Sequence, residues 1–423
     1  MLTERWDRIR AVYHDYPPQF WTLIGATFID ALGGALLFPF FTLYITSKFN
    51  VGMTTVGLIF GVFSVMSVVG STVGGAMTDR FGRKGMVIFG LIASALSSVL
   101  MGYVNTIGPF IATAVFVGLF ANAGGPARQA MLADLLPEEK QAQGFGMFRV
   151  VHNLAVTIGP AIGGLLASYS YLFLFLLDAL TSTITALIVF FKLRETKPEM
   201  APGETRETTL QTFRGYGRVL RDGTFMAFFA ATAMMVLVYT QMNGTLAVFL
   251  RDVHGVPEQG FGAIISLNAG MVVLFQFAIT RRIEGLSPFA VLAAGTALYA
   301  LGFGMYGFVS SYTMFLLAMA IITIGEMLTA PVGQAVAARL APENMRGRYM
   351  AIYGFSWILP MAAGIYLAGL IMDNLNPNWV WYAAGIVALI PMVVFWWMHR
   401  RQVLVDRGRG EAELMPATVE TLA

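Results

Sequence analysis

The sequence predicts an all-α integral membrane protein with twelve transmembrane helices, arranged as two pseudo-symmetric six-helix bundles. Hydrophobic residues make up 57% of the 423 residues and charged residues only 12%, about half the charged share of a soluble domain. Uncharged stretches of roughly 20 residues, the length that crosses the ~30 Å hydrocarbon core of a bilayer, recur along the chain. The two halves of the sequence also resemble each other, which indicates that one bundle repeats the other.

The apolar stretches define the expected spans, and the positive charges orient them. If the N-terminus lies in the cytoplasm, only Lys48 and Arg251 of the 27 Lys and Arg residues fall on the outer side. This is the expected distribution, because positive residues near spans stay on the cytoplasmic side. Both termini are therefore expected in the cytoplasm. The twelve expected spans cover residues 19–46, 54–77, 85–104, 108–131, 144–167, 171–192, 224–249, 259–280, 287–308, 313–338, 349–372 and 379–398.

Polar segments divide the chain around these spans. A cytoplasmic N-terminal segment is expected over residues 1–18, as an interfacial helix with Trp6 and Tyr13 on one side. The longest polar stretch predicts a solvated cytoplasmic linker over 193–223, although a short amphipathic helix over 209–221 on the membrane surface is an alternative. The remaining expected units are the N-terminal bundle at 19–192, the C-terminal bundle at 224–398 and a cytoplasmic tail at 399–423.

The internal repeat maps the fourth and fifth spans onto the tenth and eleventh. The segment PARQAMLADLLPE, from Pro126 to Glu138, aligns without a gap with PVGQAVAARLAPE, from Pro331 to Glu343. The same register continues downstream, where Gly159 matches Gly364. Two related bundles that face each other would enclose a site at the membrane midplane that can open to either side.

The loop after the second span carries the ordered pattern G-x-x-x-D-R-x-G-R-K. Gly75 permits close helix packing, and Gly82 permits a tight turn. Asp79 stands among cations that include Arg80 and Arg83, which suits it to charge-assisted hydrogen bonds with neighbouring helix ends. Composition alone is also compatible with an ordinary positively charged loop, but the order of the residues is more specific.

This pattern resembles the cytoplasmic signature between helices two and three of the major facilitator superfamily, and the resemblance extends over all twelve spans in order. It implies that Asp79 and Arg83 engage an acid at the cytoplasmic end of helix four, which is Asp134 here. In the family this network holds the outward-facing state. The equivalent loop in the second half, from Thr280 to Gly285, keeps charges but has lost the pattern.

The fifth span contains a second motif, built from Gly159, Pro160, Gly163 and Gly164. Pro160 removes a backbone hydrogen bond and can kink the helix, while Gly159 and Gly163 form a G-x-x-x-G face for close packing. An ordinary kinked packing helix is one interpretation. The segment also resembles the G-P-x-x-G-G motif of the proton-coupled drug antiporters of the superfamily, where it shapes the gating interface.

Three acids lie inside predicted spans, where a charged side chain costs at least ~2.5–3.5 kcal/mol. Asp30 and Glu326 fall near the midplane of spans one and ten. The resemblance places these spans around a central cavity, so both acids are candidates for proton coupling or substrate binding. A structural hydrogen bond to a neighbouring helix is the alternative for each. Asp178 is expected to belong to a local polar cluster with Thr181 and Ser182.

Other polar residues are candidates for the cavity wall or for structural roles. The antiporter branch often carries an arginine midway along helix four, but residues 114–123 have no charge and Arg128 lies nearer the cytoplasmic end. Arg128 is therefore expected to form a structural ion network with Asp134, and His152 to be an interfacial histidine. Five side chains of spans seven and eight could orient a substrate or hydrogen-bond between helices: Tyr239, Gln241, Asn243, Asn268 and Gln276.

These features predict a secondary active transporter that exports small lipophilic or cationic compounds in exchange for protons. Its expected partners are a small-molecule substrate, protons and the lipid bilayer of a bacterial inner membrane, and a monomer is expected to suffice. The proton gradient would supply the energy, with no cofactor. One alternative is a carrier of a metabolite such as a sugar, peptide or nucleoside by symport or facilitated exchange. A more remote alternative is a non-transporting membrane receptor or scaffold.

Composition and missing motifs exclude several other classes. The absence of cysteine excludes disulfides and thiolate metal sites. No phosphate-binding loop of the type G-x-x-x-x-G-K-[ST] is present, which argues against an ATP-driven pump. The acids lack histidine partners with zinc-ligand spacing, and no G-x-S-x-G motif occurs, so an enzyme and a metal site are not expected. The net charge of +3 resides in loops between spans and does not indicate nucleic-acid binding.

Overall fold

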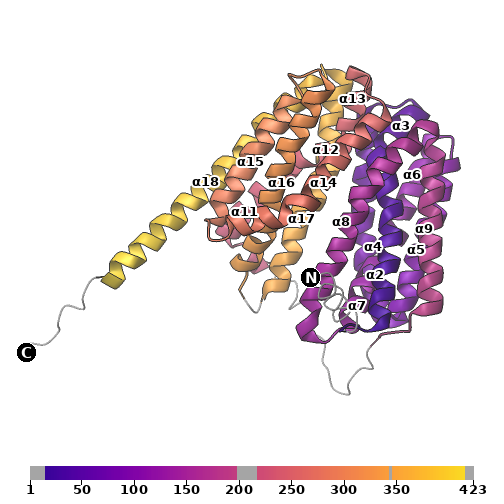
Figure 1. The fold of residues 1–423 in the computed structure, drawn as a ribbon, viewed down its shortest axis with the longest axis horizontal. Coiled ribbons are helices and arrows are strands. Elements are labelled where there is room, and N and C mark those ends of the chain that lie inside the picture. The colour runs from indigo at the N-terminus through magenta and orange to yellow at the C-terminus, as the bar shows by residue number, and fades with distance from the viewer. Residues whose placement is uncertain (1–14, 198–216, 343–344, 415–423) are drawn as a thin grey trace, which may run out of the picture.

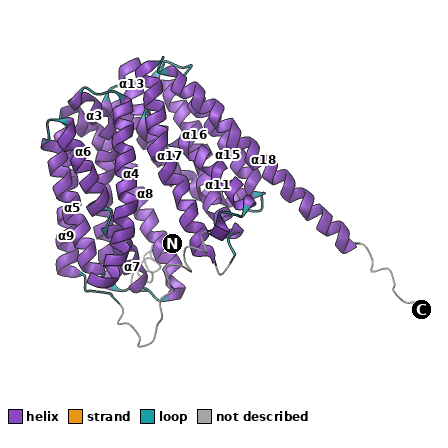
Figure 2. Ribbon diagram, turned by 180° about the vertical axis from the view of Figure 1, so that it is seen from behind, coloured by secondary structure: helices purple, strands orange, loops and turns teal. Residues whose placement is uncertain are grey.

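The computed structural model describes residues 15–197, 217–342 and 345–414; for some residues within these ranges, including Asp79, Glu138 and 402–414, it describes the backbone alone. Within these ranges the chain contains helices and no strands (Figure 2). Twelve helical segments are long and apolar enough to cross a membrane. The fold class that the sequence predicts is therefore confirmed. The predicted interfacial helix with Trp6 and Tyr13 and most of the predicted linker helix lie outside the described residues.

The N-terminal half supplies six of the spans. Its helices are α2 (Pro18–Leu37), the 3₁₀ turn η1 (Phe38–Phe40), α3 (Phe41–Phe49), α4 (Met53–Phe81), α5 (Arg83–Tyr103), α6 (Ile107–Phe116), the π-helical turn η2 (Val117–Ala121), α7 (Gly124–Asp134), α8 (Glu138–Tyr169) and α9 (Tyr171–Lys192).

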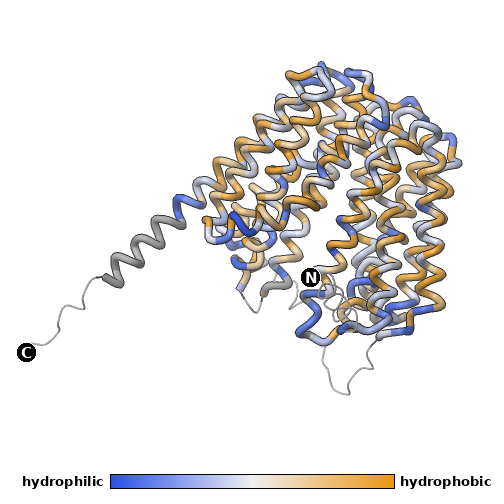
Figure 3. Tube along the Cα trace, in the orientation of Figure 1, coloured by the Kyte–Doolittle hydropathy of each residue, from blue (hydrophilic) through white to orange (hydrophobic). Residues whose placement is uncertain are grey.

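The C-terminal half supplies the other six. Its helices are α11 (Gly223–Tyr239), α12 (Gln241–Gly244), α13 (Leu246–His254), α14 (Glu258–Ile283), α15 (Pro288–Met305), α16 (Tyr312–Leu340), α17 (Arg346–Asn374) and α18 (Asn378–Leu414). The helices of both halves are mostly hydrophobic along their length and hydrophilic at their ends (Figure 3), as expected of helices that span a bilayer.

Spans one, four and seven are interrupted rather than continuous. Pro39 lacks an N–H group, which accounts for the turn η1 between α2 and α3. The turn η2 separates α6 from α7, and the short helix α12 separates α11 from α13. In transporters, interrupted helices of this kind line the binding site.

The most extensive contacts between the two halves are those of α4 with α17 and of α8 with α14. The α4–α17 contact is close because Gly57 faces the backbone of Tyr366, and Gly369 faces the backbone of Met53. A side chain at either glycine would collide with the opposite helix. Glycine is therefore required at this crossing because only its small size lets the backbones approach.

The halves converge at one face of the molecule and diverge toward the other (Figure 1). We call the face that holds the end of α9 and the start of α11 the linker face. The convergent face, which holds α3 and α13, is the opposite face.

Candidate functional site

A central cavity of about 550 Å³ lies between the two halves. Both halves contribute to its wall, and so do the interrupted spans one, four and seven. Its polar and charged lining residues are Thr27, Asp30, Ser94, Arg128, His152, Asp178, Tyr239, Asn243, Asn268 and Glu326. Asp30 and Glu326, which the sequence analysis singled out separately, therefore share one cavity.

Glu326 lies on α16, and its recorded donors among the described residues are neutral. The Tyr239 hydroxyl donates to Oε1 at 2.9 Å, and the Asn268 amide donates to Oε2 at 2.8 Å. The same amide nitrogen also lies 3.0 Å from the Thr323 hydroxyl. Among the described residues, no cationic side chain forms an ion pair with Glu326. An ionised Glu326 would therefore carry a negative charge that hydrogen bonds stabilise but no cation neutralises.

Asp30, on α2, has the opposite electrostatic setting. Arg128 Nη1 lies 2.8 Å from Asp30 Oδ2, and the Ser182 hydroxyl donates to Oδ1 at 3.0 Å. Both members of the ion pair are largely buried, with 18% of the Asp30 and 22% of the Arg128 side chain exposed. The paired arginine compensates the charge of Asp30 and holds the carboxylate in one orientation.

The position of Arg128 corrects the sequence analysis, which paired this residue with Asp134. The π-helical turn η2 precedes the helix α7, which carries both residues. Arg128 faces Asp30 on α2, whereas Asp134 faces Arg83 at the start of α5. His152, expected at the membrane interface, also lies on the cavity wall.

Only three of the five polar candidates of spans seven and eight reach the cavity. Tyr239, Asn243 and Asn268 line it. Gln241 is buried, and its amide nitrogen donates to the Leu237 carbonyl oxygen at 2.9 Å.

The amide nitrogen of Gln276 lies 3.0 Å from both the Thr280 hydroxyl and the Met327 carbonyl oxygen, away from the cavity. The structure thus places Gln241 and Gln276 in hydrogen bonds within or between helices, the alternative that the sequence left open.

The loop motif forms an ion pair at the linker face. Arg83 Nε lies 3.1 Å from Asp134 Oδ2, the contact that the family resemblance implies. Gly82 has a positive φ of 94°, a conformation that favours glycine. The Arg80 carbonyl oxygen accepts a bond from Lys197 Nζ at 3.2 Å. The side chain of Asp79 lies outside the described part of the chain.

Gly75 does not have the expected packing role. A Cβ atom added there would meet Pro126 at 3.9 Å, an ordinary van der Waals contact. The neighbouring Gly74 is the residue in close contact, because a Cβ atom there would collide with the backbone of Ala123. The close helix approach is therefore present, but one residue earlier than the motif suggests.

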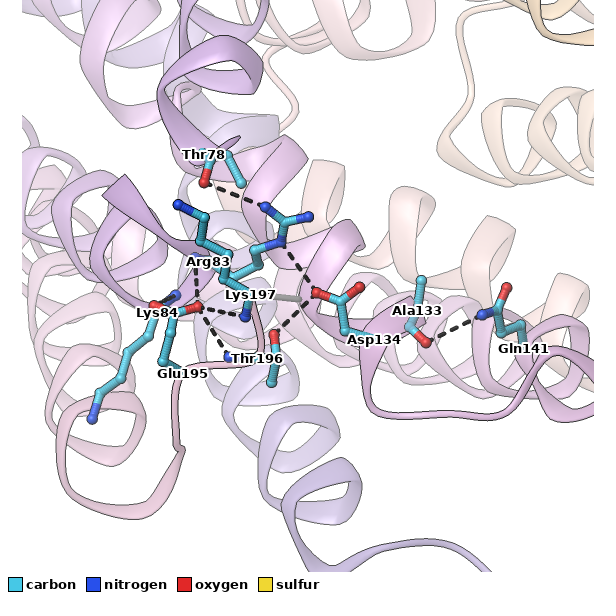
Figure 4. Close-up of polar contacts among 9 residues, drawn as sticks. All are labelled: Thr78, Arg83, Lys84, Ala133, Asp134, Gln141, Glu195, Thr196 and Lys197. Carbon is cyan, nitrogen blue, oxygen red and sulfur yellow. Dashed lines mark hydrogen bonds and ion pairs between the residues drawn. The ribbon is translucent and has the colours of Figure 1, made fainter. Parts of the chain in front are cut away.

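Glu195, which follows α9, is a member of this site that the sequence analysis treated only as part of the linker (Figure 4). Its carboxylate accepts backbone N–H bonds from Arg83 at 2.8 Å and Lys84 at 3.1 Å, the first two residues of α5. The backbone N–H groups of Thr196 and Lys197 donate to it at 3.0 Å each. Partial burial raises the pKa of Glu195, but these four donors outweigh burial and lower the pKa below its ordinary value.

We call Arg83, Asp134 and Glu195 the linker-side network. The Thr196 hydroxyl completes it by donating to Asp134 Oδ2 at 3.2 Å (Figure 4). All of these residues belong to the N-terminal half or to the chain just after it. The described contacts of the network therefore stabilise the N-terminal bundle and do not connect it to the C-terminal bundle.

The glycines of the motif in span five form two different contacts. Gly159 and Gly163 face Ala35 and Leu36 of α2 in the same half. Gly164 faces the other half, where an added Cβ atom would lie 2.9 Å from the Glu258 carbonyl oxygen of α14. The helix α8 continues through Pro160, which lines the central cavity. The motif thus positions one cavity wall and one contact between the halves.

Several polar contacts join the halves at the opposite face. Arg251 of α13 donates to the Ser47 hydroxyl at 2.5 Å and to the Thr46 hydroxyl at 3.1 Å. Asp373 of α17 accepts the backbone N–H bonds of Met53 and Thr54, each at 2.8 Å.

A further contact at that face is the bond of 2.8 Å from the Tyr171 hydroxyl to Glu258 Oε1. Nearer the linker face, Arg149 Nη1 lies 3.3 Å from Gln334 Oε1. Among the described residues, the polar contacts between the halves are therefore concentrated at the opposite face.

Comparison with known proteins identifies similar sequences along nearly the whole chain. Residues 23–287 and 245–420 match the family model described as Major Facilitator Superfamily. A "Na(+), Li(+), K(+)/H(+) antiporter" from Planococcus maritimus is 27% identical, over 86% of this chain and 91% of its own. A "Multidrug resistance protein MdtH" from Enterobacter sp. (strain 638) is 22% identical, over 86% of this chain and 90% of its own.

Solved structures show a similar fold. A POT family transporter in complex with 5-aminolevulinic acid has a TM-score of 0.74 and 16% identity, covering 89% of this chain and 95% of its own. A nucleoside transporter has a TM-score of 0.76 and 13% identity, covering 90% of this chain and 99% of its own. At these identities the likeness concerns the architecture of the helices, which agrees with the two bundles described above.

Proposed function

The chain belongs to the major facilitator superfamily, and we propose that this secondary transporter exports small lipophilic or cationic compounds in exchange for protons. The observation that carries the proposal is the setting of Glu326. Its carboxylate lies in the central cavity, is held by Tyr239 and Asn268, and has no ion-pair partner among the described residues. A proton or a cationic substrate could each neutralise the carboxylate, and their competition for it would couple the two fluxes.

The competition works through the free energy of the uncompensated charge. A charged side chain at the bilayer centre costs at least ~2.5–3.5 kcal/mol. Binding of a proton to Glu326 removes this cost, and binding of a cation offsets it by ion pairing. Since one carboxylate cannot hold both, arrival of the substrate favours release of the proton. Asp30 is already paired with Arg128 at 2.8 Å, so binding of a proton or a cation would lower the free energy less there than at Glu326. Asp30 would instead orient the substrate.

The apolar part of the cavity supports a lipophilic substrate. Phe38, Phe148, Met242 and Ile265 line it beside the acids. Aromatic and methionine side chains adapt to ligands of different shape, and aromatic faces attract organic cations. The similarity to a relative named as a multidrug resistance protein favours the same class of substrate.

We assign the linker face to the cytoplasm because the Lys and Arg residues are concentrated there. The contacts at the opposite face would then close the outer side, so this structure corresponds to an inward-facing state. Bundles at 19–192 and 224–398 would rock about the central site, joined by the linker at 193–223 and flanked by cytoplasmic segments at 1–18 and 399–423. A monomer in a bacterial inner membrane would suffice.

Exchange of alkali cations for protons is a second candidate function. The Tyr239 hydroxyl oxygen lies 2.9 Å from the Glu326 carboxylate, and the Thr323 hydroxyl oxygen shares the Asn268 amide nitrogen with that carboxylate. Hard cations prefer oxygen ligands. The similarity to a relative named as an antiporter of Na⁺, Li⁺ and K⁺ adds to this possibility.

Reconstitution in liposomes tests both candidates. A pH gradient is imposed, and uptake of ethidium, Na⁺ and Li⁺ is followed for wild type, Glu326→Gln and the control Glu139→Gln, which removes an exposed carboxylate. We expect the gradient to drive ethidium uptake in wild type and control, and Glu326→Gln to lower it at least tenfold. Gradient-driven flux of Na⁺ or Li⁺ alone would select the second candidate. A wild type that ignores the gradient with every cation would refute proton exchange.

A further inference from the structure

Asp178, on α9, is a second membrane-embedded carboxylate without an ion-pair partner among the described residues. Only 7% of the residue is exposed. The Ser98 hydroxyl of α5 donates a hydrogen bond to its Oδ2 atom. The Thr181 hydroxyl, expected to join it, instead donates to the backbone carbonyl oxygen of Asp178 at 2.9 Å. The Asp178 carboxylate is therefore buried, and among the described side chains the Ser98 hydroxyl is its hydrogen-bond donor.

Asp178 lies between two cavities. It lines the central cavity and also a smaller chamber of about 220 Å³ inside the N-terminal bundle. Aromatic and aliphatic side chains, among them Phe41, Ile59 and Phe60, line this side chamber. The apolar wall offers no counter-charge, while the central cavity gives a proton or cation access to the carboxylate.

The charged groups around Asp178 leave a surplus of negative charge. From α2, Asp30 repels it electrostatically. From α7, Arg128 is already paired with Asp30 at 2.8 Å. From α8, His152 lines the same cavity, whereas Arg149 bonds to Gln334 on α16.

From α5, only hydroxyl groups face this region: Ser98 bonds to Asp178, and Ser94 lies 3.4 Å from the Ser182 hydroxyl that binds Asp30. If both carboxylates were ionised, two negative charges would share one guanidinium group. A proton on Asp178 removes the surplus, because the ion pair already neutralises Asp30.

We propose that Asp178 is a second exchangeable proton site, located in the N-terminal bundle and acting together with Glu326 in the C-terminal bundle. The inference rests on the proposed proton exchange. Each transport cycle would then carry two protons inward, one on each carboxylate. Exchange of two protons for one monovalent cation moves one net positive charge inward, so the membrane potential as well as the pH gradient would drive export.

The number of protons per substrate provides the transport test. In proteoliposomes the membrane potential is set with K⁺ and valinomycin, and the pH gradient that just stops ethidium flux is determined at each potential. We expect two protons per ethidium for wild type and one for Asp178→Asn, with flux retained. A wild-type value of one, or the same value in both proteins, would overturn the proposal.

A second measurement does not depend on transport. Infrared difference spectra of the full-length protein in liposomes, recorded during a pH titration, report bands of protonated carboxyl groups. We expect Asp178→Asn to lose a titrating band that the control Glu139→Gln keeps. We also expect Ser98→Ala, which keeps the acid but removes its donor, to shift that band's titration.

Three outcomes separate the possible failures. If Asp178→Asn does not fold, an unshifted titration in Ser98→Ala would count against the proposal. A band that responds to Na⁺ or Li⁺ but not to pH would show a metal-cation site instead of a proton site. If wild type lacks gradient-driven flux, the proposed function fails, while the infrared titration still decides whether Asp178 binds an exchangeable proton.

Discussion

The Asp30–Arg128 pair gives Asp30 and Glu326 different electrostatic surroundings, and its removal is a test at the scale of single residues. We expect Arg128→Ala to lower stability by about 3 kcal/mol, the lower end of the range for breaking a buried pair, because a fifth of each side chain is exposed. Thermal unfolding in detergent measures the change. The double variant Asp30→Asn with Arg128→Ala should recover most of the loss, and equal losses in the single and double variants would show that the ion pair is not responsible.

Sequence alone could identify the acids at this scale but not their partners. Asp30 and Glu326 are visible because any charge within an apolar span is unusual. The contact between Asp30 and Arg128 depends on which face of α7 is turned toward α2. The π-helical turn before α7 changes that rotation, and it contains no proline from which it could be predicted. Gln241 and Gln276 lie at a depth in the membrane that would suit a cavity residue. Depth alone, however, does not determine which face of a helix a side chain occupies.

At the scale of elements, Glu195 caps the helix α5 from a distant part of the chain. We expect Glu195→Gln to lower stability at neutral pH by about 1 kcal/mol, a typical value for loss of a helix cap. The folded pKa of Glu195 lies below its ordinary value of 4.5. Its contribution is therefore present above pH 4.5 and disappears as the pH falls through the folded pKa.

Thermal unfolding of wild type and Glu195→Gln between neutral pH and pH 3 checks this prediction. The difference in stability between the two proteins should narrow in acid. A difference that stays constant with pH would mean that the glutamine change acts through packing and not through the carboxylate charge. Glu139→Gln, which removes an exposed acid on α8, serves as the control for general charge effects.

The elements themselves were largely predictable, and their interruptions were not. Hydropathy defined all twelve spans because each must fill the same thickness of hydrocarbon, and the structure confirms that number among the described residues. Pro39 signals the break in span one. Neither the turn at Val117–Ala121 nor the break around Thr240 contains a proline, so both lack the sequence signal that marks the break in span one.

At the scale of the whole molecule, the two faces differ in how they hold the halves together. The described linker-side network stays within one bundle, whereas Arg251 and Asp373 connect the bundles at the opposite face. The sequence repeat predicts two similar bundles but not this difference, because the contacts are formed by loops and helix ends that the repeat does not preserve. Contacts that are concentrated at one face would bias the conformational equilibrium toward closure of that face.

Arg251→Ala tests this bias. The change removes the bonds to Ser47 and Thr46. The loss of about 1.5–3 kcal/mol expected for hydrogen bonds to a charged group would raise the relative population of the state open at the opposite face roughly tenfold to 150-fold. The sequence contains no cysteine, so a single cysteine introduced at Asn243 on the cavity wall reports access without background. A water-soluble thiol reagent added at the opposite face should label it faster in Arg251→Ala. Unchanged labelling would mean that the remaining contacts at that face, such as those of Asp373, are sufficient for closure.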